Sequence, residues 1–270
     1  MLRQPAVADR FYDGDSTKLH QALKGLIPEG LDKVVAKAVL SPHAGYVYSG
    51  GVAGETFSRI NIPETVILLG PNHHGQYHDQ RMPLAVGTQD WDMPLGRVPL
   101  AKDLAQDLLS SSALFTADDT PHIYEHSLEV QVPFLQYFQK NLQILPVVVS
   151  PLSLQQCHQA ATELAQAIQH SNRPTLLVAS TDMTHYLSRN QASKQDHLAL
   201  KHILDLDAAG LYDTVFSRHI SMCGIIPTTI TLLAAAELGA EQAELIRYTD
   251  SGEVSGDTDK VVGYAGVIIR

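Results

Sequence analysis

Three short apolar segments of this chain each run directly into a polar turn that carries histidine. The pairs are Val34–Leu40 with His43, Thr65–Leu69 with His73, and Thr175–Ala179 with His185. In α/β sheets, ligands bind outside the carboxyl ends of the strands. If the three segments are neighbouring strands, their turns meet in one pocket, which would suit a metal ion or acid–base chemistry.

The alternation of apolar segments with stretches of helical spacing predicts an α/β fold. Further strands are expected at 84–87, 143–149, 243–249 and 261–269, a polar turn at 251–259, and helices at 17–26, 50–59, 99–110, 127–139, 154–169, 193–204, 208–217 and 227–238. No linker-like stretch interrupts this pattern. We therefore predict one domain, residues 1–270, layered around a central mixed, largely parallel sheet that is flanked by helices.

Composition and charge narrow the range of partners. The 270 residues are 44% hydrophobic and 18% charged, as in ordinary globular proteins. A formal net charge of −10 argues against nucleic acid or an anionic membrane surface as a partner. The two cysteines provide no disulfide framework, and no basic-then-apolar leader or long apolar span is present. We expect a cytoplasmic protein.

His43 and His73 are the first candidate metal ligands, because each follows a buried strand within a turn rich in Gly and Pro. A neutral imidazole is a good ligand for iron, copper or zinc. The alternative is a loop histidine that bonds a backbone carbonyl, but the equivalent placement of the two residues favours a shared site. The side chain of His74 diverges from that of His73, so it either faces the substrate or supports a ligand, or is simply solvent-exposed.

Asp182 and His185 have the spacing that puts two side chains on one face of a helical turn. A carboxylate near an imidazole fixes its tautomer and raises its basicity, so the pair is a candidate general base. Alternatively, Thr181 or Asp182 caps a short helix. The two interpretations are compatible.

Cys223 lies just before the helix expected from Pro227, where a thiol is biased toward the thiolate that binds metals. The alternative for a free cysteine is a buried, inert side chain, which suits Cys157 better because it lies within a helical pattern. In the segment from Tyr124 to Glu129, Ser127 is a candidate N-cap that would place His126 and Glu129 on one face. That segment either contributes to the pocket or begins a solvated helix.

Together these motifs resemble the Memo-like family, named after the mediator of ErbB-driven cell motility. The matching stretches, in the family's order, are Pro42–Gly50, Gly70–His74, Glu125–Glu129, Ser180–His185, Cys223–Gly224 and Val262–Ala265. The resemblance extends from about Pro5 to the C-terminus. Dinucleotide, P-loop, nucleophile-elbow and Cys-x-x-Cys patterns are absent.

The resemblance implies a fold similar to that of the class III, LigB-type extradiol dioxygenases, which are non-haem iron(II) enzymes with two histidine ligands and one carboxylate ligand. It implies that His43, His73 and Cys223 are the metal ligands of this chain. Asp182 and His126 would line the same pocket as catalytic residues, and His185 would be the acid–base residue.

Two departures from these patterns matter. The stretch Ala8–Asp13 lacks the Gly and Pro expected there in the Memo-like family. A cysteine sulfur also replaces the carboxylate of the dioxygenases. This softer ligand shifts the metal preference toward copper or zinc, so ring cleavage does not carry over with the fold.

We therefore predict an iron(II)-dependent redox enzyme that acts on a small molecule, with copper or zinc as alternative metals. The alternatives are a binding or scaffold protein that takes a peptide in the cleft, and a zinc hydrolase with metal-bound water as nucleophile. The resemblance also implies a radical-SAM protein as a pathway companion.

Overall fold

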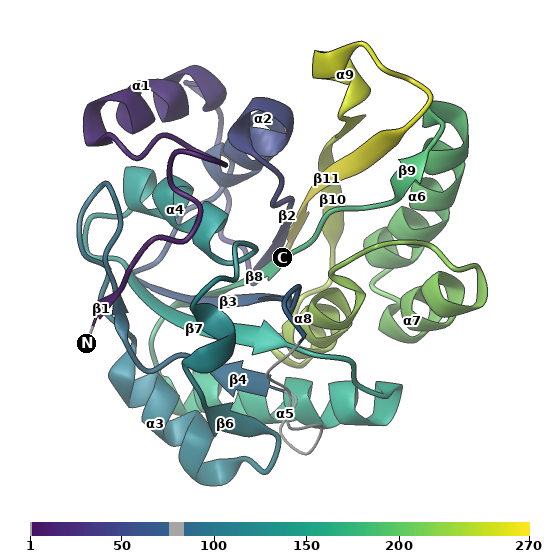
Figure 1. The fold of residues 1–270 in the computed structure, drawn as a ribbon. Helices are drawn as coiled ribbons and strands as arrows, with labels where there is room; N and C mark the ends of the chain where they lie inside the picture. The colour runs from purple at the N-terminus through teal and green to yellow at the C-terminus, as the bar shows by residue number, and fades with distance from the viewer. Residues whose placement is uncertain (1, 76–83) are drawn as a thin grey trace.

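Strand β8 (Thr175–Ser180) lies between β2 (Ala38–Ser41) and β3 (Thr65–Pro71) and runs parallel to both (Figure 1). The computed structural model describes residues 2–75 and 84–270. Every residue of β2 and β3 is buried. Such continuous apolar strands are typical of parallel sheets, because helices cover both of their faces.

Further strands extend this parallel centre on both sides. β7 (Gln143–Val149) pairs with β3 in parallel, and β11 (Val261–Ile269) pairs with β2 in the antiparallel direction. The order across the sheet is β10-β11-β2-β8-β3-β7-β4-β6, and β9 pairs with β11. The remaining bounds are Leu84–Val86 for β4, Phe115–Ala117 for β6, His185–Leu187 for β9 and Ala243–Asp250 for β10. Strands β1 (Leu2–Arg3) and β5 (Asp90–Trp91) form a separate parallel pair.

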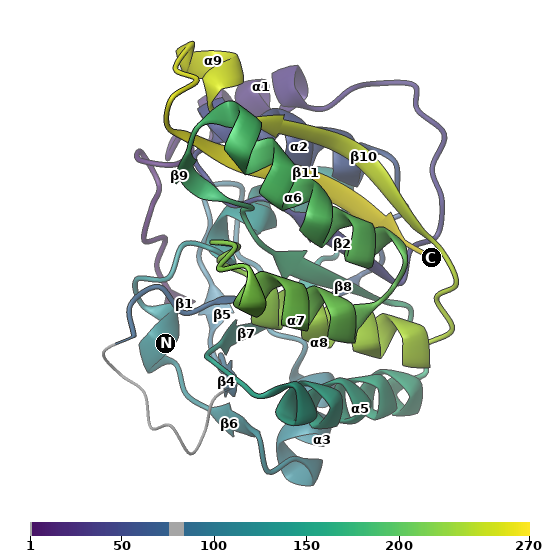
Figure 2. The same ribbon diagram turned by 90° about the vertical axis from the view of Figure 1, so that its right-hand side faces the viewer.

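Helices cover both faces of the sheet (Figures 1 and 2). One face is covered by α1 (Ser16–Leu26), α2 (Tyr46–Ser58) and α4 (Val132–Phe138). The other is covered by α3 (Lys102–Ser111), α5 (Leu154–Ser171), α6 (Arg189–Leu204), α7 (Ala208–Ser217) and α8 (Ile225–Glu237). The short helices are η1 (Thr120–His122), η2 (Glu129–Gln131) and α9 (Gly252–Ser255). Among the described residues, no helix is both long and apolar enough to cross a membrane.

The predicted α/β class with a largely parallel central sheet is confirmed, whereas several local predictions are wrong. The strand expected from Val34 begins at Ala38, and Val34 forms only an isolated bridge with Ile60. The helix expected at 127–139 begins at Val132, where Pro133 occupies its first turn. The polar turn expected at 251–259 contains α9. That the chain forms a single domain stays a prediction.

Helix α2 packs so closely against the end of α1 that one of its glycines has no room for a side chain. A Cβ on Gly54 would overlap the carbonyl oxygen of Leu26, whereas a Cβ on Gly51 would meet only the Arg247 Nη1 atom, at 3.4 Å. We expect Gly54→Ala to lower the free energy of unfolding by about 1–3 kcal/mol, since the overlap forces the backbones apart. The matched variant Gly51→Ala should be neutral or stabilising by up to about 1 kcal/mol, because alanine favours the helix. Urea unfolding measures both, and equal effects would contradict the packing argument.

Candidate metal centre

The carboxyl ends of β2, β3 and β8 lie at one edge of the sheet, as the sequence pattern predicts. Ser41 at the end of β2 is in register with Ser180 at the end of β8, and Leu69 of β3 is in register with Ala179. The three turns that follow therefore leave the sheet side by side. They carry His43, His73 and Asp182 to the same edge.

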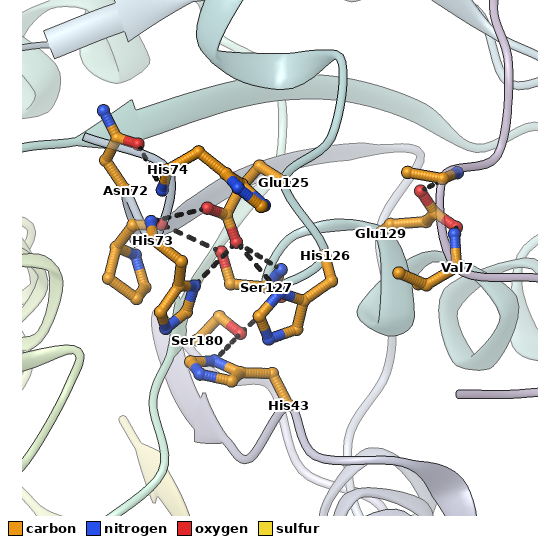
Figure 3. Close-up of polar contacts among 12 residues, drawn as sticks. Val7, His43, Asn72, His73, His74, Glu125, His126, Ser127, Glu129 and Ser180 are labelled. Atoms are coloured by element: carbon orange, nitrogen blue, oxygen red, sulfur yellow. Dashed lines mark hydrogen bonds and ion pairs between the residues drawn. The ribbon is translucent and has the colours of Figure 1, made fainter. Parts of the chain in front are cut away.

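Three imidazoles meet above this edge (Figure 3). The ring centroids of His43 and His73 are 5.2 Å apart, those of His43 and His126 are 5.4 Å apart, and those of His73 and His126 are 4.5 Å apart. One ring nitrogen of each residue lies within 4.8 Å of the other two, a spacing suited to holding one metal ion. We call these three side chains the imidazole cluster. His126 reaches it from residues 123–128, a segment between η1 and η2 that we call the site loop.

Glu125 of the site loop orients His73. Its buried carboxylate accepts hydrogen bonds from the His73 backbone N–H at 2.7 Å, from His73 Nδ1 at 2.8 Å and from the Ser127 backbone N–H at 2.8 Å (Figure 3). Burial opposes the charged form, but the contacts with His73 outweigh it and hold the pKa of Glu125 well below its usual value. The carboxylate accepts a hydrogen bond from Nδ1–H, so the lone pair of His73 lies on Nε2, where a metal can bind it.

Hydrogen bonding also fixes the tautomer of His43. Ser180 Oγ lies 2.6 Å from the Ser127 carbonyl and accepts a hydrogen bond from Gln131 Nε2 at 2.8 Å. Since a carbonyl only accepts, the Ser180 hydroxyl donates its hydrogen to Ser127. His43 Nδ1, 3.0 Å from Ser180 Oγ, is therefore the donor in that contact, and its lone pair lies on Nε2.

Two members of the imidazole cluster are held in the neutral form that binds metals. Burial, followed by the neighbouring His73, lowers the pKa of His43 to about 3. Burial, followed by His43, lowers the pKa of His126 to about 3 as well. Both rings are therefore uncharged near neutral pH, and no proton has to leave before a cation binds.

Cys223 lies beside this cluster, just before α8. Its Sγ atom is 3.2 Å from His43 Nε2 and accepts a hydrogen bond from the Asp182 backbone N–H at 3.2 Å. Burial, followed by the charge of Asp182, raises the pKa of the thiol above its ordinary value. The thiolate expected from the nearby helix N-terminus is thus not favoured by the protein groups alone. A cation bound in the site would favour the thiolate.

The structure places Asp182 and His185 differently from the helical turn that their spacing predicts. Asp182 and the residues up to Thr184 form no helix, and His185 begins strand β9. The Asp182 carboxylate accepts the His43 backbone N–H at 2.8 Å, and burial raises the pKa of this carboxyl group. His185 Nδ1 lies 2.9 Å from the Ser221 carbonyl. Ser221, and not Asp182, therefore fixes the tautomer of His185.

Three further candidates lie outside the imidazole cluster. His74 is exposed and its ring lies 6.3 Å from that of Tyr124. The prediction that Glu129 shares a helical face with His126 is wrong, because Glu129 is fully buried and bonds to the N-terminal segment (Figure 3). Cys157 is buried within α5, as its helical pattern predicts.

Sequence reasoning assigned no role to three residues that support the cluster, Glu125, Gln131 and Ser180. The sequence offers two hints of their roles: Glu125 is adjacent to His126, and Ser180 is adjacent to the turn that carries Asp182. Neither adjacency shows which loop reaches over the sheet. His126, which the family resemblance groups with the catalytic residues, lies where a ligand would lie. The predicted ligand set of His43, His73 and Cys223 stays a prediction.

The similarity of this chain to known proteins identifies its family. The family described as Memo-like protein matches residues 3–268. The chain belongs to the Memo-like family. Its relatives include a MEMO1 family protein of Methanosarcina barkeri, 40% identical over 100% of both chains. A MEMO1 family protein of Aquifex aeolicus is 37% identical over 99% of this chain and 98% of its own.

A solved structure shares the fold of this Memo-like protein. An uncharacterised protein of Escherichia coli K12 superposes with a TM-score of 0.57 and covers 86% of this chain and 98% of its own. Its sequence identity is 12%, so the likeness concerns the fold alone.

Glu125 orients His73 but does not belong to the imidazole cluster. Substitution of Glu125 should therefore weaken metal binding while all three imidazoles of the cluster remain. We expect Glu125→Gln to weaken binding of Zn²⁺ by about 10- to 100-fold, the usual effect of losing a carboxylate behind a histidine ligand. A competition titration with a chromophoric chelator measures this affinity. Glu55→Gln, on the surface of α2, is the control, and equal affinity in both variants would contradict the assigned role.

His122 provides a test of the buried electrostatics near the site loop. Burial lowers the pKa of His122 to about 4, and its Nε2 atom lies 3.0 Å from the Ala85 carbonyl. Above pH 6.5, the ordinary pKa of histidine, the ring is neutral in both folded and unfolded chains. As the pH falls from 6.5 toward 4, only the unfolded chain gains a proton, so the folded state loses stability.

We expect the stability difference between the metal-free wild type and His122→Gln to shift in favour of the variant by about 1.4 kcal/mol per pH unit across this interval. Urea unfolding at pH 7.5, 6 and 4.5 measures the difference. Other titrating groups are common to both proteins and cancel. A difference that is constant with pH would contradict the lowered pKa.

Proposed function

We propose that this protein is a metal-dependent enzyme whose ion is held by His43, His73 and His126, with Cys223 as an adjacent sulfur ligand. The observation that carries the proposal is the convergence of three imidazole nitrogens within 4.8 Å from three separate parts of the chain. Two of these rings are neutral near pH 7 because they are buried. Imidazole nitrogens held this close together in a partly buried site cost free energy, and a bound cation offsets that cost.

The donor set indicates which metals fit. Imidazole nitrogen suits iron, copper and zinc, whereas magnesium and calcium prefer oxygen. Cys223 adds a soft donor 3.2 Å from His43 Nε2. We infer iron(II) as the preferred ion, since the motifs resemble a family similar in fold to the iron-dependent extradiol dioxygenases. Iron(II) would supply open coordination positions at which oxygen and a small substrate react.

The chain's own residues supply orientation and proton transfer. Glu125 and Ser180 each accept the Nδ1 hydrogen of one ligand, so they fix the direction of its lone pair. His185 donates Nδ1–H to the Ser221 carbonyl, which leaves Nε2 as the atom that takes or gives a proton. We assign the acid–base role to His185. Asp182 holds the His43 backbone and faces Cys223 through its own N–H.

A zinc hydrolase is the second candidate, and the imidazole cluster itself favours it. Three histidines with an open fourth position form a ligand set of catalytic zinc, which lowers the pKa of bound water to about 7. The same residues would then orient that water, with His185 accepting its proton. Two exposed tyrosines favour a third candidate, a surface beside the site that binds a partner. Tyr124 has its ring 6.3 Å from that of His74, and Tyr186 has its ring 5.7 Å from that of His185.

Metal content tests the proposal directly. Protein purified without oxygen should contain about one transition-metal ion per chain by elemental analysis. His43→Ala and His126→Ala should each remove most of it, since losing one of three ligands opens the site. His158→Ala, on the exposed side of α5, is the control and should keep the wild-type content. Wild-type protein that takes up no transition metal would overturn the proposal.

The identity of the ion distinguishes the candidates. Iron with oxygen uptake on addition of an aromatic diol or another small reductant supports the redox reaction, and loss of uptake in His185→Gln supports its acid–base role. Zinc at full occupancy, with turnover of ester or amide substrates, supports the hydrolase instead.

A further inference from the structure

The Arg3 side chain, about 120 residues away in sequence, holds the site loop at several points. Its Nε atom donates to the His122 carbonyl at 2.9 Å, and its Nη2 atom donates to the Glu125 carbonyl at 2.8 Å. Its Nη1 atom pairs with the Glu129 carboxylate. The guanidinium also lies over the ring of Trp91, 4.2 Å from its centroid. One buried cation thus contacts residues before, within and after the site loop.

Glu129 holds the same N-terminal segment from the other side. Besides Arg3, its carboxylate accepts hydrogen bonds from the backbone N–H groups of Ala6 and Val7 and from the Tyr12 hydroxyl. The carboxylate is fully buried. We call Arg3, Ala6, Val7, Tyr12 and Glu129 the N-terminal clamp. Four donors on one buried carboxylate make this contact specific in direction as well as strong.

The site loop turns its other side to the metal centre. Figure 3 shows Glu129 and Val7 lying away from the imidazole cluster, while Glu125 and His126 point into it. Phe11, between two clamp residues, packs its ring 4.8 Å from that of His126. The backbone carbonyl of Phe11 accepts the N–H of Tyr46 at the start of α2. The N-terminal segment therefore lies directly behind the third imidazole.

We infer that Arg3 and Glu129 are positioning residues of the metal centre, which set the place of His126 through the site loop. This inference rests on the proposed function. The site loop lies outside regular helix and strand, so no ladder of backbone hydrogen bonds fixes its path. Instead, the guanidinium fork of Arg3 fixes the path of the loop, because it binds the His122 carbonyl just before the loop and the Glu125 carbonyl within it.

The test uses the full-length chain with Co²⁺ as the probe, because the visible absorption of Co²⁺ reports the ligands and their geometry. The variants are Arg3→Lys, His126→Ala, the combination of the two, and Glu129→Gln. Lysine keeps the charge beside Glu129 but lacks the fork that reaches both carbonyls. Arg247→Lys is the matched control, because Arg247 also pairs with carboxylates but contacts α2 and α9 instead of the site loop.

We expect Arg3→Lys and Glu129→Gln to weaken Co²⁺ binding by about 10- to 100-fold and to shift the spectrum toward that of His126→Ala. Adding Arg3→Lys to His126→Ala should cause no further loss, since both changes act through one ligand. Arg247→Lys should match the wild type. Thermal unfolding confirms that each variant is folded.

Wild-type affinity and spectrum in folded Arg3→Lys would overturn the inference. So would losses that simply add in the double variant, because the effect of Arg3 would then not pass through His126. Failure of the proposed function gives a different result. In that case the wild type binds no Co²⁺, or His126→Ala binds it with wild-type affinity and spectrum.

Discussion

The parallel pairing of β2 and β3 on either side of β8 is the constraint on which the site depends. Parallel strands end at the same edge, so residues separated by more than 100 positions leave the sheet within a few ångströms of each other. His43, His73 and Asp182 occupy the first residues beyond that edge. A one-residue slip of either pairing would turn these side chains to the opposite face and separate them.

Burial gives the site its chemical character. Desolvation keeps His43 and His126 neutral and disfavours the thiolate of Cys223. All three groups are thus in low-dielectric surroundings, where a cation interacts strongly with an uncharged nitrogen or with a thiol that can lose its proton. Glu125 is the exception, since hydrogen bonds from His73 and Ser127 keep it charged. It provides a fixed negative charge behind the ligands.

The sequence predicts the parts of the site that follow strands and misses those that depend on distant contacts. Apolar runs ahead of His43 and His73 are local signals, and the structure brings the two residues together. The helical turn predicted for Asp182 and His185 is wrong, because Val262 of β11 pairs with His185 and draws it into β9. Helical spacing places Glu129 beside His126, yet helix α4 starts only at Val132. The charge partner of Glu129 is Arg3, which no local pattern reveals.

The central claim is that three imidazoles share one metal ion. A crystal structure of the wild type soaked in Zn²⁺, with anomalous scattering measured at the zinc edge, tests it most directly. We expect one strong peak at about 2.0–2.1 Å from nitrogens of His43, His73 and His126. A peak elsewhere on the molecule, with no ion between the three imidazole rings, would contradict the claim.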